Sequence, residues 1–428
     1  MPEALLEHPS STSRTDKEPQ DGMSPGGVDQ SLDHPGLHAP HHGGPAIIFI
    51  CLGCAWLGTV IAVALSPALP AIAQVFGRGT DGAGLAQLLQ TLPAVTMIIG
   101  ALTSGYLSER LGRRIILITA LTIYAVSGAA GLFAGSLPLL VGCRLLLGLA
   151  GGAMLTVSYA TIGEYFEGAA RERMLGFGST FGSLSSVFHL LVAGMLVDHF
   201  GWRAPFWLYL PALAIVPFAW FGMHRGRTAG ASTPLSWRPV VALWPVFLLL
   251  TAYTIGMYMS VIQTPFLVVA HGLGSATMIG FILATTSVMA AICAAFYGFL
   301  RPLLGFNGIF LLISAALGGG MLICVAAPNL PLFLVGAALL GLGTGLIEPA
   351  CASRALAKTQ EALHDRAMGA IIMALFLGQF LNPVVLAPLR QSGGIGFAFV
   401  VAGGAYLCGA ILFGSAILRK LTTKSTSG

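Results

Sequence analysis

Side chains that carry a charge, an amide or an imidazole are scarce inside the long apolar stretches of this 428-residue chain. Each one found there therefore needs a chemical explanation. Burying polar or ionisable groups in a bilayer is costly, and the few that occur usually serve a function. The candidates are Arg144, His189 and Glu348, the amides Gln87, Gln90, Gln263, Gln379 and Asn382, and the tyrosine Tyr258.

Glu348 is the sole acid within any apolar stretch. A carboxyl group in such a place can bind a proton on one side of a membrane and release it on the other, which makes Glu348 the leading candidate for a proton carrier. It is followed directly by Pro349. A second interpretation therefore stays open, in which Glu348 caps or gates the end of a helix.

Arg144 and His189 lie at a similar depth in neighbouring stretches, so we expect them to be neighbours. His189 would then belong to a central cavity, or it would be a packed histidine that is hydrogen-bonded to a backbone carbonyl. For Arg144 one open alternative is a structural arginine bonded to carbonyls. Gln90 and Tyr258 fit polar faces that point toward the interior of a helix bundle.

The elements that must position these residues are membrane-spanning helices. Only 9% of the residues are charged and the mean hydropathy is +0.84, which is typical of an integral membrane protein. Runs of about 20 apolar residues are long enough to cross a ~30 Å hydrocarbon core as helices, and they lack the alternation of barrel strands. We expect twelve transmembrane helices, at 47–74, 85–107, 114–135, 138–163, 173–197, 204–222, 240–266, 276–300, 307–327, 331–353, 367–389 and 396–418.

The connection at 223–239 divides the chain into an N-terminal half, 46–222, and a C-terminal half, 240–420. Fifteen lysines and arginines fall in connections on one side of the predicted bundle and three on the other. The positive-inside rule then places both termini and the 223–239 linker in the cytoplasm. We expect residues 1–45 to form a disordered cytoplasmic tail, and 421–428 a second short tail.

The two halves repeat one another at a fixed offset of 193 residues. Leu137-Pro138 returns as Leu330-Pro331, Gly112 returns as Gly305, and His189 returns as Asn382. A constant offset indicates two duplicated six-helix halves.

The charged connection between the second and third helices reads Gly105-Tyr106-Leu107-Ser108-Glu109-Arg110-Leu111-Gly112-Arg113-Arg114. It resembles the signature loop of the major facilitator superfamily, G-x-L-x-[D/E]-R-x-G-R-R. The resemblance covers about residues 46–420 and implies a single substrate site at the midplane between the halves. It also implies a conformational latch formed by Gly105, Glu109, Arg110, Gly112, Arg113 and Arg114.

Two further motifs of the superfamily are altered here. Arg144 opens a segment similar to R-x-x-Q-G, with Leu147 at the glutamine, and would by resemblance couple protons or stabilise the contact between the first and fourth helices. His189-Leu190 stands where many drug–proton antiporters have Gly-Pro, which weakens the similarity to that group.

The expected function is secondary active transport of a small amphipathic organic molecule across the inner membrane, coupled to protons, with export favoured over uptake. The chain has no phosphate-binding loop and no zinc-protease helix, and we expect neither an enzyme nor a cofactor. Beyond substrate, protons and lipid, no nucleic acid or second subunit is expected. Two alternatives stay open. One is an uptake symporter. The other is a metal or metal-chelate exporter that uses His34, His38, His41 and His42.

Overall fold

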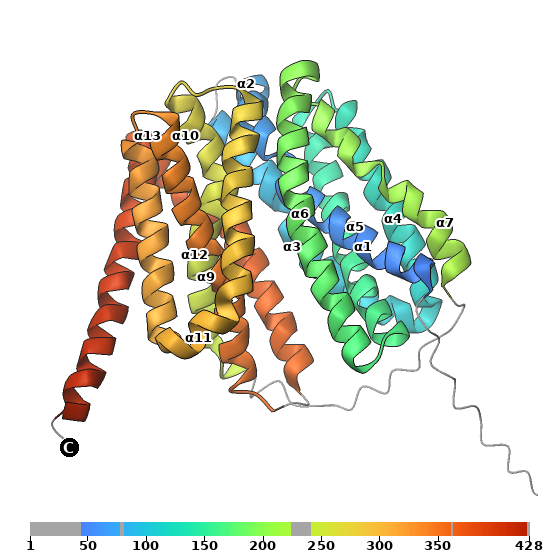
Figure 1. Ribbon diagram of the computed structural model, residues 1–428. Helices are drawn as coiled ribbons and strands as arrows, with labels where there is room; N and C mark the ends of the chain where they lie inside the picture. Colours follow the sequence, from blue (N-terminus) through green and yellow to red (C-terminus); the bar gives the residue numbers. More distant parts are fainter. Residues whose placement is uncertain (1–43, 78–80, 224–240, 361–362, 426–428) are drawn as a thin grey trace, which may run out of the picture. The chain divides into compact units, whose positions relative to one another are not determined.

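The computed structural model describes residues 44–77, 81–223, 241–360 and 363–425, and these form helices without strands (Figure 1). The N-terminal half contains α1 (Pro45–Val63), η1 (Ser66–Ala68), α2 (Leu69–Phe76), α3 (Gly82–Leu111), α4 (Arg113–Ala129), η2 (Ala130–Leu132), α5 (Leu137–Tyr165), α6 (Gly168–Phe200), η3 (Ala204–Tyr209) and α7 (Ala212–Gly222). The C-terminal half contains α9 (Trp244–Tyr258), η4 (Met259–Gln263), α10 (Thr264–Ala270), α11 (Ala276–Ala326), α12 (Leu330–Leu356) and α13 (His364–Ser425). The tail with its histidines and most of the 223–239 linker lie outside the described residues.

Ten helical stretches of the described chain are long and apolar enough to cross a membrane. Two of these, α11 and α13, are each interrupted by one glycine with non-helical backbone, Gly305 and Gly394, and their ribbons reverse direction in Figure 1. When their arms are counted separately, the ten stretches give the twelve expected segments. The prediction of an all-α membrane protein is confirmed.

The first and seventh spans are broken at proline residues. A 3₁₀ turn containing Pro67 separates α1 from α2, and a π-helical segment precedes Pro265 at the start of α10. Proline lacks an amide proton and crowds the preceding turn, so the backbone leaves the α-helical hydrogen-bond pattern there. Prolines therefore interrupt the α-helix in both spans.

Backbone geometry repeats at the offset seen in the sequence. Gly112 and Gly305 have φ of 84° and 63°, and Gly201 and Gly394 have φ of 82° and 77°. Both pairs are 193 residues apart. A side chain at these positive φ angles is strained, so glycine is required at the turns that end equivalent helices.

Helix crossings repeat as well. A Cβ added at Gly152 would lie 2.1 Å from the Met97 carbonyl oxygen, and one at Gly345 would lie 2.1 Å from the Ala290 carbonyl oxygen. Met97 and Ala290 are themselves 193 residues apart. The same glycine therefore permits close helix contact in both halves, α5 on α3 and α12 on the first arm of α11.

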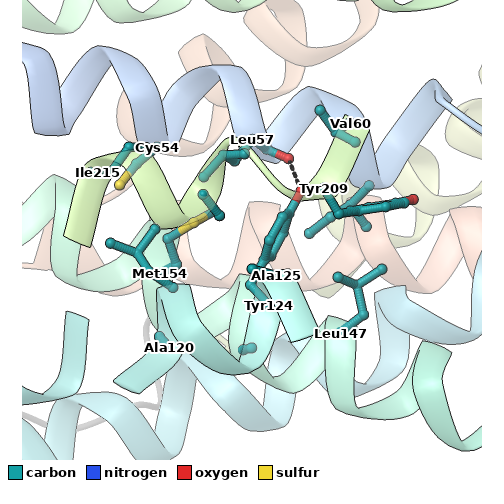
Figure 2. Packing of buried hydrophobic residues seen from close by; sticks show 14 of the residues in the cluster. Cys54, Leu57, Val60, Ala120, Tyr124, Ala125, Leu147, Met154, Tyr209 and Ile215 are labelled. Atoms are coloured by element: carbon teal, nitrogen blue, oxygen red, sulfur yellow. Dashed lines mark hydrogen bonds between the residues drawn. The ribbon is translucent and has the colours of Figure 1, made fainter. Parts of the chain in front are cut away.

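Each half has its own apolar core. In the N-terminal half, Tyr124 is fully buried and donates a 2.6 Å hydrogen bond to the Leu57 carbonyl beside Cys54 and Met154 (Figure 2). Cys54 is a free, buried thiol that packs in this core. No group of His, Cys, Asp or Glu in the described residues could hold a metal ion.

Candidate functional site

Hydrogen bonds between the two halves gather toward one end of the helices. We call this the clasp end and define it by Asp81, Asp198 and Arg390. The other end is the basic end, where the Gly105–Arg114 connection, the start of α6 and Arg354 lie. Within the described residues, each hydrogen bond that joins the halves lies at the clasp end or in the middle of the bundle.

The first clasp joins α13 to the start of α3. Arg390 donates to the Asp81 carboxylate and to Oε1 of Gln87, and Gln391 lies 3.5 Å from Asp81. Burial raises the pKa of Asp81, but hydrogen bonds from the Gly84 amide and from Arg390, together with the arginine's charge, outweigh it and hold this pKa below its ordinary value.

The second clasp joins α6 to the start of α11. The Asp198 carboxylate accepts hydrogen bonds of 2.9 and 2.8 Å from the amides of Ala276 and Thr277, which are free donors at a helix N-terminus. Asp198 and Gln391 are equivalent positions of the repeat. The two clasps therefore hold the bundle at two pseudo-symmetric places.

An amide cluster lies below the clasps. Gln87 and Gln263 exchange hydrogen bonds of 2.8 and 3.1 Å across the halves, and Gln263 donates a further 2.9 Å bond to Asn382. Gln90 donates to the Ala62 carbonyl, and Gln379 is buried. The structure thus brings Gln263 and Asn382 together, and Gln263 joins the two halves through Gln87.

A cavity of about 710 Å³ lies between the halves, from mid-bundle toward the basic end. Its wall is built by α1, α5 and α6 of one half and α9, α11 and α12 of the other. The lining residues are Ala55, Gly58, Thr59, Leu155, Tyr159, Gly178, Ser179, Gly182, Ser183, Ser186, Met257, Ser287, Ala290, Ala291, Ala294, Thr344, Gly345, Glu348, Pro349 and Ala352. Small and hydroxyl side chains dominate this wall, which keeps the space open and offers weak hydrogen bonding.

Glu348 lies on this wall, deep in the protein but exposed to the cavity. It is close enough to Tyr159 and Tyr258 to act on both hydroxyl groups electrostatically. Of the candidates drawn from the sequence, Glu348 is the one that lines the cavity directly.

His189 lies immediately behind the cavity wall. Its Nδ1 is 3.0 Å from Oγ1 of Thr59, a lining residue, and Thr59 donates its hydroxyl proton to the Trp56 carbonyl at 2.7 Å. With that proton committed, Nδ1 of His189 must be the donor to Thr59. His189 Nε2 is buried without a hydrogen-bond partner among the described residues, so it can accept a proton or a water.

Arg144 lies away from the cavity. Its guanidinium donates to the Tyr209 hydroxyl at 2.9 Å and stacks over the rings of Phe206 and Tyr209 at 4.8 and 5.3 Å. Arg144 and His189 are therefore not hydrogen-bond partners, although they lie at a similar depth. Within the described residues, Arg144 bonds to Tyr209 and His189 bonds to Thr59. The reason is direction, because the side chain of Arg144 faces η3 inside its own half.

The residues of the expected latch lie at the basic end. Arg113 donates 2.6 Å to Glu164 and 3.2 Å to the Ala160 carbonyl, both on α5. Arg110 lies over the Tyr106 ring and Arg114 over the Trp220 ring, at 4.5 and 4.7 Å. Gly105 has open space around it and Gly112 forms the turn at positive φ. The side chain of Glu109 is outside those that the structure describes.

The clasps were missed from sequence. Asp81, Asp198 and Arg390 lie at helix ends on the side with few charges, and that scarcity was the available signal. The serines of the cavity wall gave no signal because helical hydroxyls satisfy themselves locally, as Ser183 does by donating to the Ser179 carbonyl at 3.1 Å.

Comparison with known families gives one family match. A profile described as Major Facilitator Superfamily matches residues 48–274, more than half of the chain. Among curated relatives, the chain is 34% identical to the niacin transporter NiaP of Acinetobacter baylyi over 28% of this chain and 28% of the relative. It is 34% identical to the multidrug transporter protein MdtP of Bacillus subtilis over 25% and 20% of the two chains. It is 32% identical to the multidrug efflux pump LfrA of Mycolicibacterium smegmatis over 35% of this chain and 29% of the relative. The matches thus span less than a third of each of these relatives.

Solved structures share the fold over nearly the whole chain. A D-xylose–proton symporter superposes with a TM-score of 0.72 at 15% identity, covering 86% of this chain and 96% of that one. The nucleoside transporter NupG superposes with a TM-score of 0.71 at 11% identity, covering 86% and 98%.

Proposed function

The chain belongs to the major facilitator superfamily, and on that premise we propose that it is a secondary active transporter. It would carry a small amphipathic organic molecule across the inner membrane by alternating access, coupled to protons. The observation that carries the proposal is the cavity between the halves, with Glu348 on its wall.

The positions of the inter-half bonds support alternating access. The clasps and the amide cluster join the halves above the cavity, and the cavity extends toward the basic end. The positive-inside rule assigns the basic end to the cytoplasm, so this conformation faces inward. Transport then requires the clasps to open and the halves to rock around the cavity until the basic end closes.

Glu348 is the group that would couple protons to this motion. In the inward-facing state its carboxyl group meets the cytoplasm through the cavity, and after rocking it would meet the other side. Proton binding on one side and release on the other would let transport follow the proton gradient. Similarity to the multidrug efflux pump LfrA supports export over uptake.

The test uses the protein in proteoliposomes, with ethidium and nicotinate as probes because the relatives include multidrug and niacin transporters. We expect the parent to accumulate at least one probe against its gradient when a pH difference is applied. Glu348→Gln should still exchange the probe in counterflow but fail to accumulate it. Glu167→Gln is the matched control, since this exposed acid at the start of α6 lies outside the cavity.

Uphill transport by Glu348→Gln at the parent's rate would move proton coupling to another group, with His189 next in line. Absence of any proton movement with transport would refute proton coupling altogether. The metal-exporter alternative is tested separately by deleting residues 1–45, because an organic exporter should be indifferent to that loss.

A further inference from the structure

The charged lining of the cavity is of one sign only, negative. Of its twenty lining residues Glu348 alone is charged, and no lysine, arginine or histidine is among them. Thr59, Ser179, Ser183, Ser186, Ser287, Thr344 and Tyr159 supply hydroxyl groups from several helices. An ionised Glu348 therefore makes the interior of this cavity negative.

Two arginines on cavity helices, Arg144 and Arg354, have other partners, and Arg171, Arg173 and Arg301 do not line the cavity. Arg144 is stacked on Phe206 and Tyr209 inside its half. Arg354, six residues after Glu348 on α12, lies 4.4 Å from the centre of the Phe306 ring. Arg113 is paired with Glu164 at the basic end. An anionic substrate would consequently meet a carboxylate with no lining cation to offset it.

The titratable groups nearest to Glu348 are weak acids. Tyr159 of α5 lines the cavity and Tyr258 of α9 lies outside the lining, while α1, α6 and α11 present hydroxyl, methyl and glycine surfaces there. His189 is separated from the cavity by Thr59. The Glu348 carboxyl group therefore sets the net charge of the cavity by itself. That charge is zero when Glu348 is protonated and minus one when it is ionised.

We propose that the substrates are organic monocations, and that each binds the Glu348 carboxylate in place of a proton. The proposal rests on the transport function above and assigns its substrate class. The Tyr159 ring on the cavity wall suits a cation because an aromatic face attracts positive charge. The volume lies within the usual range of cavities for drug-sized molecules, about 300–1,000 Å³.

Charge balance gives the exchange its stoichiometry. Binding of one monocation releases one proton from Glu348, and binding of a proton on the other side releases the cation. The cavity carries the same net charge in both crossings. Exchange is therefore electroneutral, driven by a pH difference and indifferent to membrane potential.

Binding to the purified full-length chain tests the substrate class with two sets of compounds that differ in charge. The first set is 1-methylnicotinamide, nicotinamide and nicotinate, which are a cation, a neutral molecule and an anion on one ring. The second is rhodamine 6G and fluorescein, a cationic and an anionic xanthene dye. We expect the cation to bind about tenfold or more tighter than its anionic counterpart in at least one set. Cation affinity should fall as the solution is acidified and Glu348 is protonated.

Glu348→Gln should lose about tenfold or more in cation affinity and also lose the pH dependence, whereas Glu348→Asp should retain part of both. Glu167→Gln should bind as the parent does. Ser183→Lys gives a second route if Glu348→Gln fails to fold, since an ammonium group on the facing wall should weaken cation binding. Melting temperature and gel filtration report whether each variant is folded.

Tighter binding of the anions or the neutral compound, or binding of none of the cations, overturns the proposal. So does cation affinity that Glu348→Gln leaves unchanged. These outcomes are distinct from failure of the transport function: proton-coupled movement of nicotinate would remove the cation assignment and keep the transporter. In proteoliposomes, a potassium diffusion potential without a pH difference should drive no more 1-methylnicotinamide uptake than protein-free liposomes show, and potential-driven accumulation above that blank would refute electroneutral exchange.

Discussion

The clasp between Asp81 and Arg390 should set how often the cavity opens to the far side of the membrane. Asp81→Asn removes the charge that faces Arg390 while keeping the size of the side chain. The Arg390 side chain is 8% exposed and that of Asp81 is 36% exposed, so only one partner is well shielded from water. The substitution therefore leaves a nearly buried arginine with Gln87 as its remaining neutral acceptor.

The size of the effect lies between two limits. Exposed ion pairs contribute about 0–1 kcal/mol, and hydrogen bonds to charged groups contribute about 1.5–3 kcal/mol. The partial exposure of Asp81 and the retained bond to Gln87 favour a cost of about 1–2 kcal/mol, which shifts the equilibrium toward the outward-open state by a factor of about 5–30. Asp198→Ala removes a hydrogen-bond acceptor at the N-terminus of α11. This substitution should shift the same equilibrium toward the outward-open state by about a further 1 kcal/mol. The two clasps share no partner, so their effects should add.

Cysteine accessibility measures this equilibrium. Ser183→Cys places a thiol on the cavity wall, and a membrane-impermeant reagent is applied from either side of oriented vesicles, with the chain lacking Ser183→Cys as the blank. We expect slow labelling from the clasp side in the parent and faster labelling in Asp81→Asn, with the double variant fastest. Unchanged labelling in the Asp81→Asn, Asp198→Ala double variant would refute the clasp.

Acid should loosen the same clasp, and the pKa of Asp81 gives the sign. This pKa is lowered when the clasp is closed, so the clasp is fully favoured above the ordinary aspartate pKa of about 4 and is lost as pH falls through the lowered value. The ratio of labelling from the clasp side to labelling from the basic side cancels the pH dependence of the thiolate, and it should consequently stay constant between pH 8 and pH 5. A change within that window would have to come from a group other than Asp81.

The remaining predictions concern the latch, the buried histidine and the helix crossings. Glu109→Gln should slow transport and leave probe affinity nearly unchanged, because a latch acts on motion; a large loss of affinity at normal turnover would contradict this role. His189→Asn should keep the fold and alter the pH profile of transport, whereas an unchanged profile would leave His189 as a packing residue. Gly345→Ala should lower the melting temperature, since its Cβ would meet the Ala290 carbonyl oxygen at 2.1 Å and cost about 1–3 kcal/mol. Gly404→Ala, which has nothing within 4 Å, is the control that should be neutral.

Much of the fold could be predicted because a bilayer makes the sequence pattern strict. The lengths of the apolar stretches were sufficient to locate the helices. Gly112 and Gly305, which are 193 residues apart in the sequence, both have positive φ angles in the structure. The breaks in the first and seventh spans likewise lie at prolines, Pro67 and Pro265. Each of these signals follows from a local rule, since a spanning segment must satisfy its own backbone.

The site was only partly predictable because it depends on direction rather than on depth. Arg144 and Glu348 both looked like buried charges in the sequence, yet one faces an aromatic cluster in its own half and the other faces the cavity. Depth along a helix follows from counting residues. The rotation of each helix, and hence which polar group reaches the shared space, depends on packing between segments distant in sequence.

The repeat itself explains why a single acid can govern the cavity. Leu155 and Glu348 are equivalent positions, 193 residues apart, and both line the cavity. Two carboxylates at these places would face each other across one space, repel, and titrate as a coupled pair. With leucine in one half and glutamate in the other, the symmetric frame supplies two similar halves that rock, while the chemistry stays asymmetric. The rocking motion then depends on the pair of clasps and on the helix crossings at Gly152 and Gly345. The exchange of a proton for a cation depends only on Glu348.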